Sequence, residues 1–319
     1  MMKQFEGQMS IIRQAASRCK IYAASYNSHY WYPFKLSKVG KGWDALDRSC
    51  IEMILDSNVQ DGGVSNEEVL EEAIKRRPAK VVPKDYVNDP EATRESLIEF
   101  EELANAEPEF RSDIIPVIQG DHVDHLERYD AFYDQYSYLA IGGMLGIEPL
   151  EQVKIIKEVR EHVGNNVYLH GFGVSTSLHL IKALRHNPDL LDSLDMSTAE
   201  TMVKNGKTAD WTFKQAKPEF PMSDSTGDVG MRVLPMPYGD EKSVVNGGFS
   251  MSTLVMLNYM LSDLVDEDRL EEMFYDQLGF GELEKLMVNA DSRDRSEVDF
   301  TDLNAARDTS GSATLDSFS

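Results

Sequence analysis

The chain has 319 residues, of which 41% are hydrophobic and 9% aromatic, so it can bury a large core as one large domain or two small ones. Its formal net charge is -23, from 55 acidic and 32 basic side chains, and its overall field therefore does not attract nucleic acid or anionic lipid. Either the partner is not a polyanion, or the protein works in concentrated salt, which screens the field. We favour the second interpretation, because an acidic surface is a halophilic trait.

The two cysteines, Cys19 and Cys50, form no CxxC motif, which excludes a zinc ribbon and a thioredoxin-like site. Two thiols are compatible with a reducing cytoplasm. Residues 1–14 lack the apolar segment of a signal peptide, and no apolar run reaches the length of a membrane span. We therefore expect a cytoplasmic protein with no membrane partner.

Short apolar runs alternate with amphipathic segments from about residue 20 onward. The runs that predict strands are residues 20–26, 50–57, 79–87, 113–120, 138–144, 166–174 and 192–198. The segments that predict helices are residues 65–77, 89–106, 122–136, 148–164 and 177–187. The aromatic and basic stretch at 27–43 is expected to be a loop.

Strands that alternate with helices at this spacing predict a parallel sheet. The number of runs approaches the eight strands of a (β/α)8 TIM barrel, and we expect that α/β fold, in a regular or an irregular form. A doubly wound open sheet is the alternative, but no GxGxxG motif follows the first strand.

The regular alternation ends near residue 200. Residues 218–249 are rich in Pro and Gly and predict loops, whereas residues 250–279 predict one or two helices packed on the barrel. Residues 291–319 are polar and acidic with few large apolar side chains. We expect a single domain over residues 1–290 and a flexible tail over residues 291–319.

Polar residues or glycines follow the apolar runs, at the end of a barrel where function is found. They are Asp56, Asp85, Gln119, Gly142, Gly143, His170 and Asp195. Any one of these aspartates is explained as well by capping of the next element. Three carboxylates, an amide and a glycine pair at successive strand ends are harder to explain as caps.

Such a barrel mouth suits a planar polar ligand. A carboxylate accepts two parallel N–H bonds, as from the edge of guanine, and glycines let a ligand approach the backbone. A second carboxylate can act as nucleophile or as acid and base. No phosphate loop is present, and His122 and His125 fit a solvated helix face better than a metal site. We expect neither a metal nor a cofactor.

These strand ends resemble, in the same chain order, those of the tRNA-guanine transglycosylase family. The segment LDSNVQDGG is similar to that family's DSGGFQ, and VIQGDHVDHLE to its xQG segment. AIGGMLGIEP is similar to VGGLAVGE, YLHGFGVS to YLMGVG, and LDSLDMST to DMFDCVLPT. VVPKDYVNDPEATRESL resembles the family's Asp-bearing segment and its following helix. The resemblance covers residues 50–200.

The resemblance implies a catalytic pair. Asp195 matches the nucleophile that attacks the sugar C1′ and forms a covalent glycosyl-enzyme, and Asp56 matches the general acid and base. The implied base-binding residues are Asp85, Gln119, Gly142, Gly143 and Gly171, with Gly173 on the same pocket. His170 falls where the family has an apolar residue against the base.

The departures from the family are informative. Gln60 stands where an aromatic residue usually stacks on the base, so His170 or an aromatic from residues 29–34 is expected instead. The family's zinc-binding CxCxxC is absent. Together these features resemble the DNA deazapurine transglycosylases of viruses and mobile elements, related to queuosine and archaeosine enzymes. The implied partners are DNA and a free preQ0- or preQ1-type 7-deazaguanine base, in a halophilic host's cytoplasm, with a homodimer left open.

Two alternatives remain. The protein could act on tRNA, or it could be a non-catalytic nucleic-acid-binding paralogue, although retention of Asp56 and Asp195 disfavours the latter. Local basic residues could meet the nucleic acid, or they could be ordinary surface lysines. They are Lys35, Lys38 and Lys41 with Trp31 and Trp43 in the 27–43 stretch, and Lys204, Lys207, Lys214 and Lys217.

Overall fold

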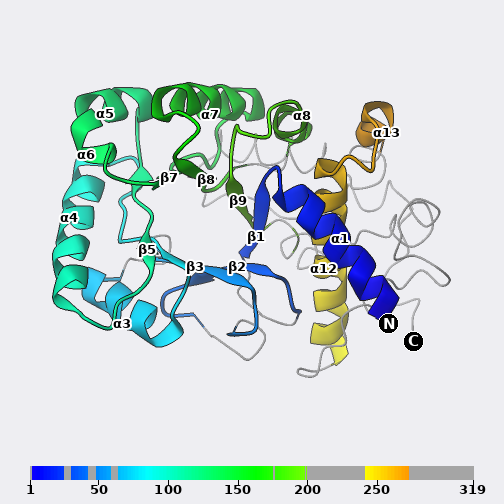
Figure 1. Ribbon diagram of the computed structural model, residues 1–319, viewed down its shortest axis with the longest axis horizontal. Helices are drawn as coiled ribbons and strands as arrows, with labels where there is room; N and C mark the ends of the chain where they lie inside the picture. The colour runs from blue at the N-terminus through cyan, green and yellow to red at the C-terminus, as the bar shows by residue number, and fades with distance from the viewer. Residues whose placement is uncertain are drawn as a thin grey trace, which may run out of the picture.

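The computed structural model describes residues 2–24, 30–41, 48–58, 64–174, 177–197, 199 and 241–272. Its helices are α1 (Met2–Ala16), α3 (Asn66–Arg76), α4 (Pro90–Ala106), α5 (His122–Arg128), α6 (Asp130–Tyr133), α7 (Pro149–Val163), α8 (Leu178–His186), α12 (Glu241–Leu261) and α13 (Glu267–Glu272). Its strands are β1 (Lys20–Ala24), β2 (Phe34–Lys38), β3 (Glu52–Asp56), β4 (Lys80–Val81), β5 (Asp113–Ile114), β6 (Val117–Ile118), β7 (Tyr138–Ile141), β8 (Tyr168–Gly171) and β9 (Ser193–Met196). The helices lie outside a curved sheet (Figure 1).

The described strands form one parallel sheet in the order β5-β4-β3-β2-β1-β9-β8-β7-β6. Its edge strands β5 and β6 are consecutive in the chain, separated only by Ile115 and Pro116. Ile115 N–H donates to Val81 at 2.9 Å, and the Pro116 carbonyl accepts from Ala140 N–H at 2.8 Å. The fold is thus α/β and compatible with a TIM-like barrel, but the strand ladder is not a closed barrel. The prediction is confirmed only in that coarser form.

Two elements differ from the sequence-based expectation. Strand β2 occupies the middle of the stretch expected to be a loop, and helix α1 precedes the first predicted strand. In β2, Phe34 and Leu36 belong to the apolar cluster inside the curved sheet, together with Tyr22 and Ile54. Because alternate residues of a strand face the same side, Lys38 continues this inward row at the end of the strand.

The helices between strands begin and end where the sequence signals them. Ser65 and Glu68 form a capping box at the start of α3, and the Asp89 side chain caps α4 immediately before Pro90. Helix α7 ends at Val163 and is capped by Gly164, whose φ of 73° suits glycine. These caps set where each connecting helix returns to the sheet.

A charged cluster lies inside the sheet at the starts of the strands. Glu52 forms ion pairs with Lys20, at 2.8 Å, and with Lys80, and it accepts a hydrogen bond from the Tyr22 hydroxyl at 2.6 Å. Burial alone would raise the pKa of Glu52, but the hydrogen bonds from Lys20, Lys80 and Tyr22 lower this pKa to about 2. The carboxylate is therefore a permanent anion in the interior, at the opposite end of the strands from Asp56.

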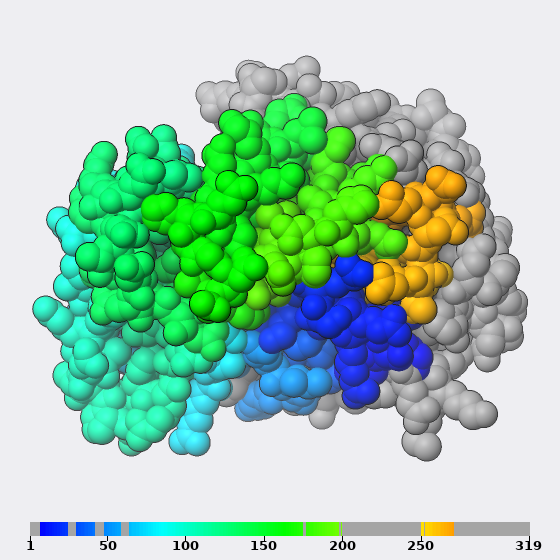
Figure 2. All heavy atoms as spheres, turned by 45° about the horizontal axis from the view of Figure 1, so that its top comes forward, coloured from blue at the N-terminus to red at the C-terminus, as the bar shows by residue number. Residues whose placement is uncertain are grey.

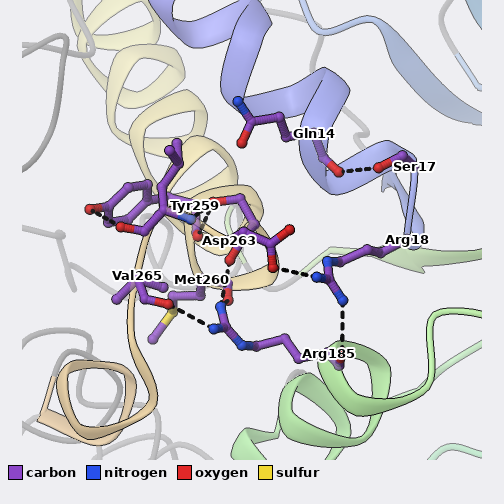
Figure 3. Close-up of polar contacts among 10 residues, drawn as sticks. Gln14, Ser17, Arg18, Arg185, Tyr259, Met260, Asp263 and Val265 are labelled. Carbon is purple, nitrogen blue, oxygen red and sulfur yellow. Dashed lines mark hydrogen bonds and ion pairs between the residues drawn. The ribbon is translucent and has the colours of Figure 1, made fainter.

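Helices α12 and α13 confirm the predicted C-terminal helices, and α12 packs on α1 and α8. Figure 2 shows the corresponding blue and orange segments side by side. Arg185 of α8 donates to the carbonyl of Met260 in the last turn of α12, at 2.9 Å, and to that of Val265 beyond the helix, at 2.7 Å (Figure 3). Arg18 donates to the Arg185 carbonyl at 2.7 Å and pairs with Asp263. The two arginines thus join α1, α8 and the end of α12.

Three sets of expected features lie outside the described residues. They are residues 218–240 of the predicted Pro- and Gly-rich loops, the acidic tail at 291–319, and the side chains of Gln60, Trp43 and the lysines between 204 and 217. Residues 241–249 of that loop prediction are described, and there the prediction is wrong, because they form the first turns of α12.

Candidate active site

Asp56 and Lys38 end two adjacent strands and face each other. The register of β2 and β3 pairs them directly, and Lys38 Nζ lies 3.8 Å from Asp56 Oδ2. The Asn58 N–H donates to Asp56 Oδ1 at 3.3 Å. Burial raises the pKa of Asp56, and the Lys38 charge opposes that rise. The two side chains are only 17% and 13% exposed, so this pair lies at a partly open end of the sheet interior.

Asp85 and Gln119 lie together, as expected from the sequence. Gln119 Nε2 donates to Asp85 Oδ2 at 2.7 Å, and the Ser57 hydroxyl donates to Asp85 Oδ1 at 3.3 Å. Asn88 N–H donates to Gln119 Oε1 at 3.4 Å. Burial, and next the charge of Asp56, raise the pKa of Asp85 to about 6. Asp85 therefore lies close enough to Asp56 for the two charges to interact.

Gly142 and Gly143 make room for the Gln119 side chain. A Cβ on Gly142 would stand 2.5 Å from Gln119 Nε2, and one on Gly143, whose φ is 66°, would stand 3.0 Å from Gln119 Oε1. The Gly142 N–H already donates to Ile118 at 2.9 Å, and its carbonyl lies 2.8 Å from His122 Nε2. The Gly142 backbone, which was predicted to contact a ligand, is therefore already hydrogen-bonded within the protein. The absence of a side chain at Gly142 instead leaves room for Gln119.

Asp195 lies on the inward face of β9. Its neighbours Leu194 and Met196 belong to the outer apolar cluster, so Asp195 faces the interior. The Gly173 N–H donates to Asp195 Oδ1 at 3.1 Å. The pKa of Asp195 is raised to about 6, chiefly by burial. The Gly173 hydrogen bond opposes this rise, and the Asp56 charge adds to it. Asp56 is thus coupled to both other carboxylates, and the three form one acidic cluster with Lys38.

His170 and Gly171 do not line an open wall. The His170 side chain is 0% exposed, and its ring packs 4.4 Å from the Phe172 ring, so no face of it is free to stack on a base. A Cβ on Gly171 would stand 2.5 Å from a methyl group of Val174, so this glycine serves close packing. Both residues were predicted to contact substrate; instead they lie behind Asp195 in the sheet interior.

Sequence reasoning did not place Lys38 beside the carboxylates, and it did not single out Phe172. Lys38 was placed in a loop with Lys35, yet Lys35 is buried in β2 with its Nζ 4.4 Å from the Tyr30 ring. The alternation within FKLSK was the signal that could have found β2 and its terminal lysine. Phe172, the residue after β8, is partly exposed and packs on the interior cluster and on the His170 ring. Tyr30 and Tyr32, which were considered for stacking, are core residues.

The two histidines of α5 do not lie on a solvated face. His122 contacts Gly142, and His125 Nε2 lies 2.7 Å from the Tyr133 hydroxyl; both side chains are buried. Within the described ranges, no three His, Cys, Asp or Glu side chains are arranged to hold a metal ion.

No protein-family model matches the chain, and no curated protein matches it. In the part of the chain with described coordinates, no helix has both the length and the apolar character needed to cross a membrane.

Proposed function

We propose that the protein is a base-exchange transglycosylase that replaces guanine in DNA by a 7-deazaguanine base through a covalent Asp195–glycosyl intermediate. One observation carries the proposal: burial raises the pKa of Asp56, Asp85 and Asp195, and ionisation of Asp56 would raise the pKa of the other two further, so the three carboxyl groups resist being ionised together. Such coupled carboxylates favour a site with one protonated and one ionised member, which acid-assisted nucleophilic displacement requires.

In the first half of the reaction, a carboxylate oxygen of Asp195 attacks C1′ of the flipped-out nucleotide. The C1′–N9 bond breaks, and Asp56 donates its proton to a ring nitrogen of the departing guanine. With a pKa of about 6, Asp195 is largely ionised at neutral pH and suited to the nucleophile's role. Burial raises the pKa of Asp56 and so favours the proton-carrying form of an acid.

In the second half, N9 of the incoming 7-deazaguanine attacks C1′. The ester bond to Asp195 breaks and restores the carboxylate, while the N9 proton of the incoming base passes to Asp56. The transition state on either side has oxocarbenium character, which the nearby anion stabilises. Proton and charge therefore balance over one turnover without a cofactor.

Asp85 and Gln119 provide the base-binding edge. At neutral pH, Asp85 is largely ionised and accepts the paired N–H donors of a guanine-type edge. The Gln119 amide already spans from Asp85 to the Asn88 N–H, so a base would exchange these internal hydrogen bonds for its own. Ser57 holds the remaining oxygen of Asp85 in place.

The choice of DNA over tRNA rests on the resemblance and on the missing CxCxxC motif. The net charge of -23 means that binding to either polyanion depends on local cations and on salt that screens the acidic surface. The accompanying proposal is a halophilic host, with the enzyme in the cytoplasm.

Isotope incorporation tests the function. Purified protein in concentrated KCl is incubated with labelled 7-deazaguanine and either duplex DNA or tRNA, and the nucleosides are then analysed by mass spectrometry. Label in DNA and a covalent DNA adduct on the wild type are expected, and both should vanish in Asp195→Asn. Asp189→Asn, which changes an exposed carboxylate in the turn after α8, is the matched control. Label in tRNA alone would reassign the substrate, and label in neither would refute the proposal.

A further inference from the structure

His170 occupies a fixed position inside the sheet. It is the third residue of β8 and fully buried. Its ring lies edge-on to the Tyr22 ring, with centroids 5.8 Å apart, and to the Phe172 ring, with centroids 4.4 Å apart. An imidazole held between two aromatic rings cannot turn outward to reach solvent, so its two nitrogens must find their partners inside.

The two ring nitrogens face two residues of the neighbouring strand. His170 pairs with Ser193 in the β8–β9 register, and Nδ1 lies 2.7 Å from the Ser193 hydroxyl oxygen. Nε2 lies 4.0 Å from Asp195 Oδ1, and it has no hydrogen-bond partner among the described residues. Ser193 and Asp195 are two apart on β9 and so share the inward face. The orphaned nitrogen is therefore directed at the carboxylate.

The protonation state of the ring limits what it can do. Burial, and then the Lys80 charge, lower the pKa of His170 to about 3, so the ring is neutral and carries one proton. If the proton is on Nε2, the Ser193 hydroxyl donates to Nδ1 and an N–H faces Asp195. The other tautomer would direct a lone pair at an anion. The field of the Asp195 carboxylate therefore favours the Nε2–H tautomer.

We propose that His170 is a positioning residue for Asp195. The neutral Nε2–H of His170 and the Gly173 N–H together hold Oδ1 of Asp195, and the other carboxylate oxygen is left to react. This inference rests on the proposed function, because it assigns Asp195 the nucleophile's role. The 4.0 Å separation is longer than a hydrogen bond, and a small rotation of the Asp195 side chain in the free protein closes it by about 1 Å.

An apolar side chain would fill the same space without leaving a nitrogen unsatisfied. A buried donor with no partner is destabilising, so an imidazole here is explained only if the contact with Asp195 forms. The groups that act on this pair are few among the described residues. Lys38 and Asp56 face Asp195 from β2 and β3, whereas Lys80 and Tyr22 face His170 from β4 and β1.

The test measures the pKa of the Asp195 carboxyl group directly by carbon-13 NMR of labelled protein, assigned with Asp195→Asn. In His170→Leu, which lacks both nitrogens, the Asp195 pKa should rise by about one unit, because a donor to the ionised form is lost. In His170→Gln, whose amide N–H stands in for Nε2–H, it should stay near the wild-type value. His125→Gln, a buried histidine bonded to Tyr133, is the control and should leave it unchanged.

Nitrogen-15 NMR of the wild-type ring provides a measurement that needs no variant. The Nε2–H tautomer is expected, and an Nδ1–H tautomer would overturn the proposal even if His170→Leu fails to fold. An Asp195 pKa that does not move in folded His170→Leu would overturn it as well. Because neither readout uses substrate, a protein that exchanges no base but passes both tests would refute only the proposed function.

Discussion

Asp56 carries the electrostatic link within the site because it acts on two other carboxylates. Its charge raises the pKa of Asp85 and of Asp195, while Lys38, 3.8 Å away, is the cation that partly offsets it. Holding three acids and one base in a mostly buried cluster costs folding free energy that an ordinary capping role would not require. Substituting one of these charged side chains should therefore change the free energy of unfolding measurably.

Removing one of these buried charges should stabilise the protein. The pKa of Asp195 is about 6 in the fold against 3.8 for an unperturbed aspartate, so its ionisation opposes folding as pH rises through that interval. Asp195→Asn should raise the free energy of unfolding by about 1–3 kcal/mol at neutral pH, and the gain should shrink towards about pH 4. Urea unfolding at both pH values measures this. Exposed Asp189→Asn should change it by less than about 0.5 kcal/mol. A gain that grows at low pH would contradict the assignment.

Lys38 should control the ionisation of the nucleophile. Its charge lowers the pKa of Asp195 and of Asp56, so Lys38→Met should raise both pKa values and leave less Asp195 ionised. The acidic limb of covalent-adduct formation should then move up by about one pH unit. Lys38→Arg keeps the charge and should keep the limb. An unshifted limb in a folded Lys38→Met protein would remove Lys38 from the site.

The positions of the three aspartates were predictable because each follows an apolar run, and the ends of parallel strands meet at one edge. Two details were not. Whether Gly142 exposes its backbone depends on Gln119 and His122, which lie on other elements. Whether His170 faces a pocket or the interior depends on the rings of Tyr22 and Phe172. Such contacts are tertiary, and no local pattern encodes them.

At the level of elements, the C-terminal end of α12 is bonded to α8 through one arginine. The last carbonyls of a helix lack internal donors, and Arg185 of α8 supplies donors to Met260, Ser262 and Val265 around the end of α12. Arg18, just beyond α1, pairs with Asp263 in the same region. The junction in Figure 3 therefore holds the C-terminal helices against the rest of the fold.

Truncation of Arg185 should loosen this junction. Arg185→Ala leaves several carbonyls without their charged donor, and we expect a loss of about 2–4 kcal/mol in the free energy of unfolding. Arg128→Ala is the control. Arg128 forms a solvent-exposed ion pair with Glu91, at 3.4 Å, and losing this pair should lower the free energy of unfolding by less than about 1 kcal/mol. Urea denaturation compares the two. Equal effects would mean that α12 is held by apolar packing alone.

Sequence patterns located the α/β units well and the chain's first elements poorly. Helix α3 was predictable from Ser65 and its charged turns. Strand β2 was missed because its lysines suggested a solvated loop, although Lys35 is buried against an aromatic ring and Lys38 faces an aspartate. A closed ladder was expected, but Pro116 has no N–H to continue one, and it separates β5 from β6.

The acidity of the whole molecule should make its stability depend on salt. A net charge of -23 repels itself, and salt shortens the range of that repulsion. Raising KCl from about 0.1 M to about 2 M should increase Tm by several degrees. A variant with Glu→Gln at four exposed sites, Glu71, Glu102, Glu127 and Glu161, should show a smaller increase. Calorimetry tests this, and a Tm that falls with KCl would rule out the halophilic interpretation.

The pairing of β9 between β1 and β8 has a consequence for synthesis of the protein. Lys20 of β1 lies opposite Ser193 of β9, so most of the sheet is made before this contact can form. Closing so long a loop is entropically costly and slow. Until β9 leaves the ribosome, β1 and β8 both present unpaired edges that invite association with other chains. When β9 pairs with β1 and β8, it covers both of these edges, and the same step brings Asp195 to the other two aspartates.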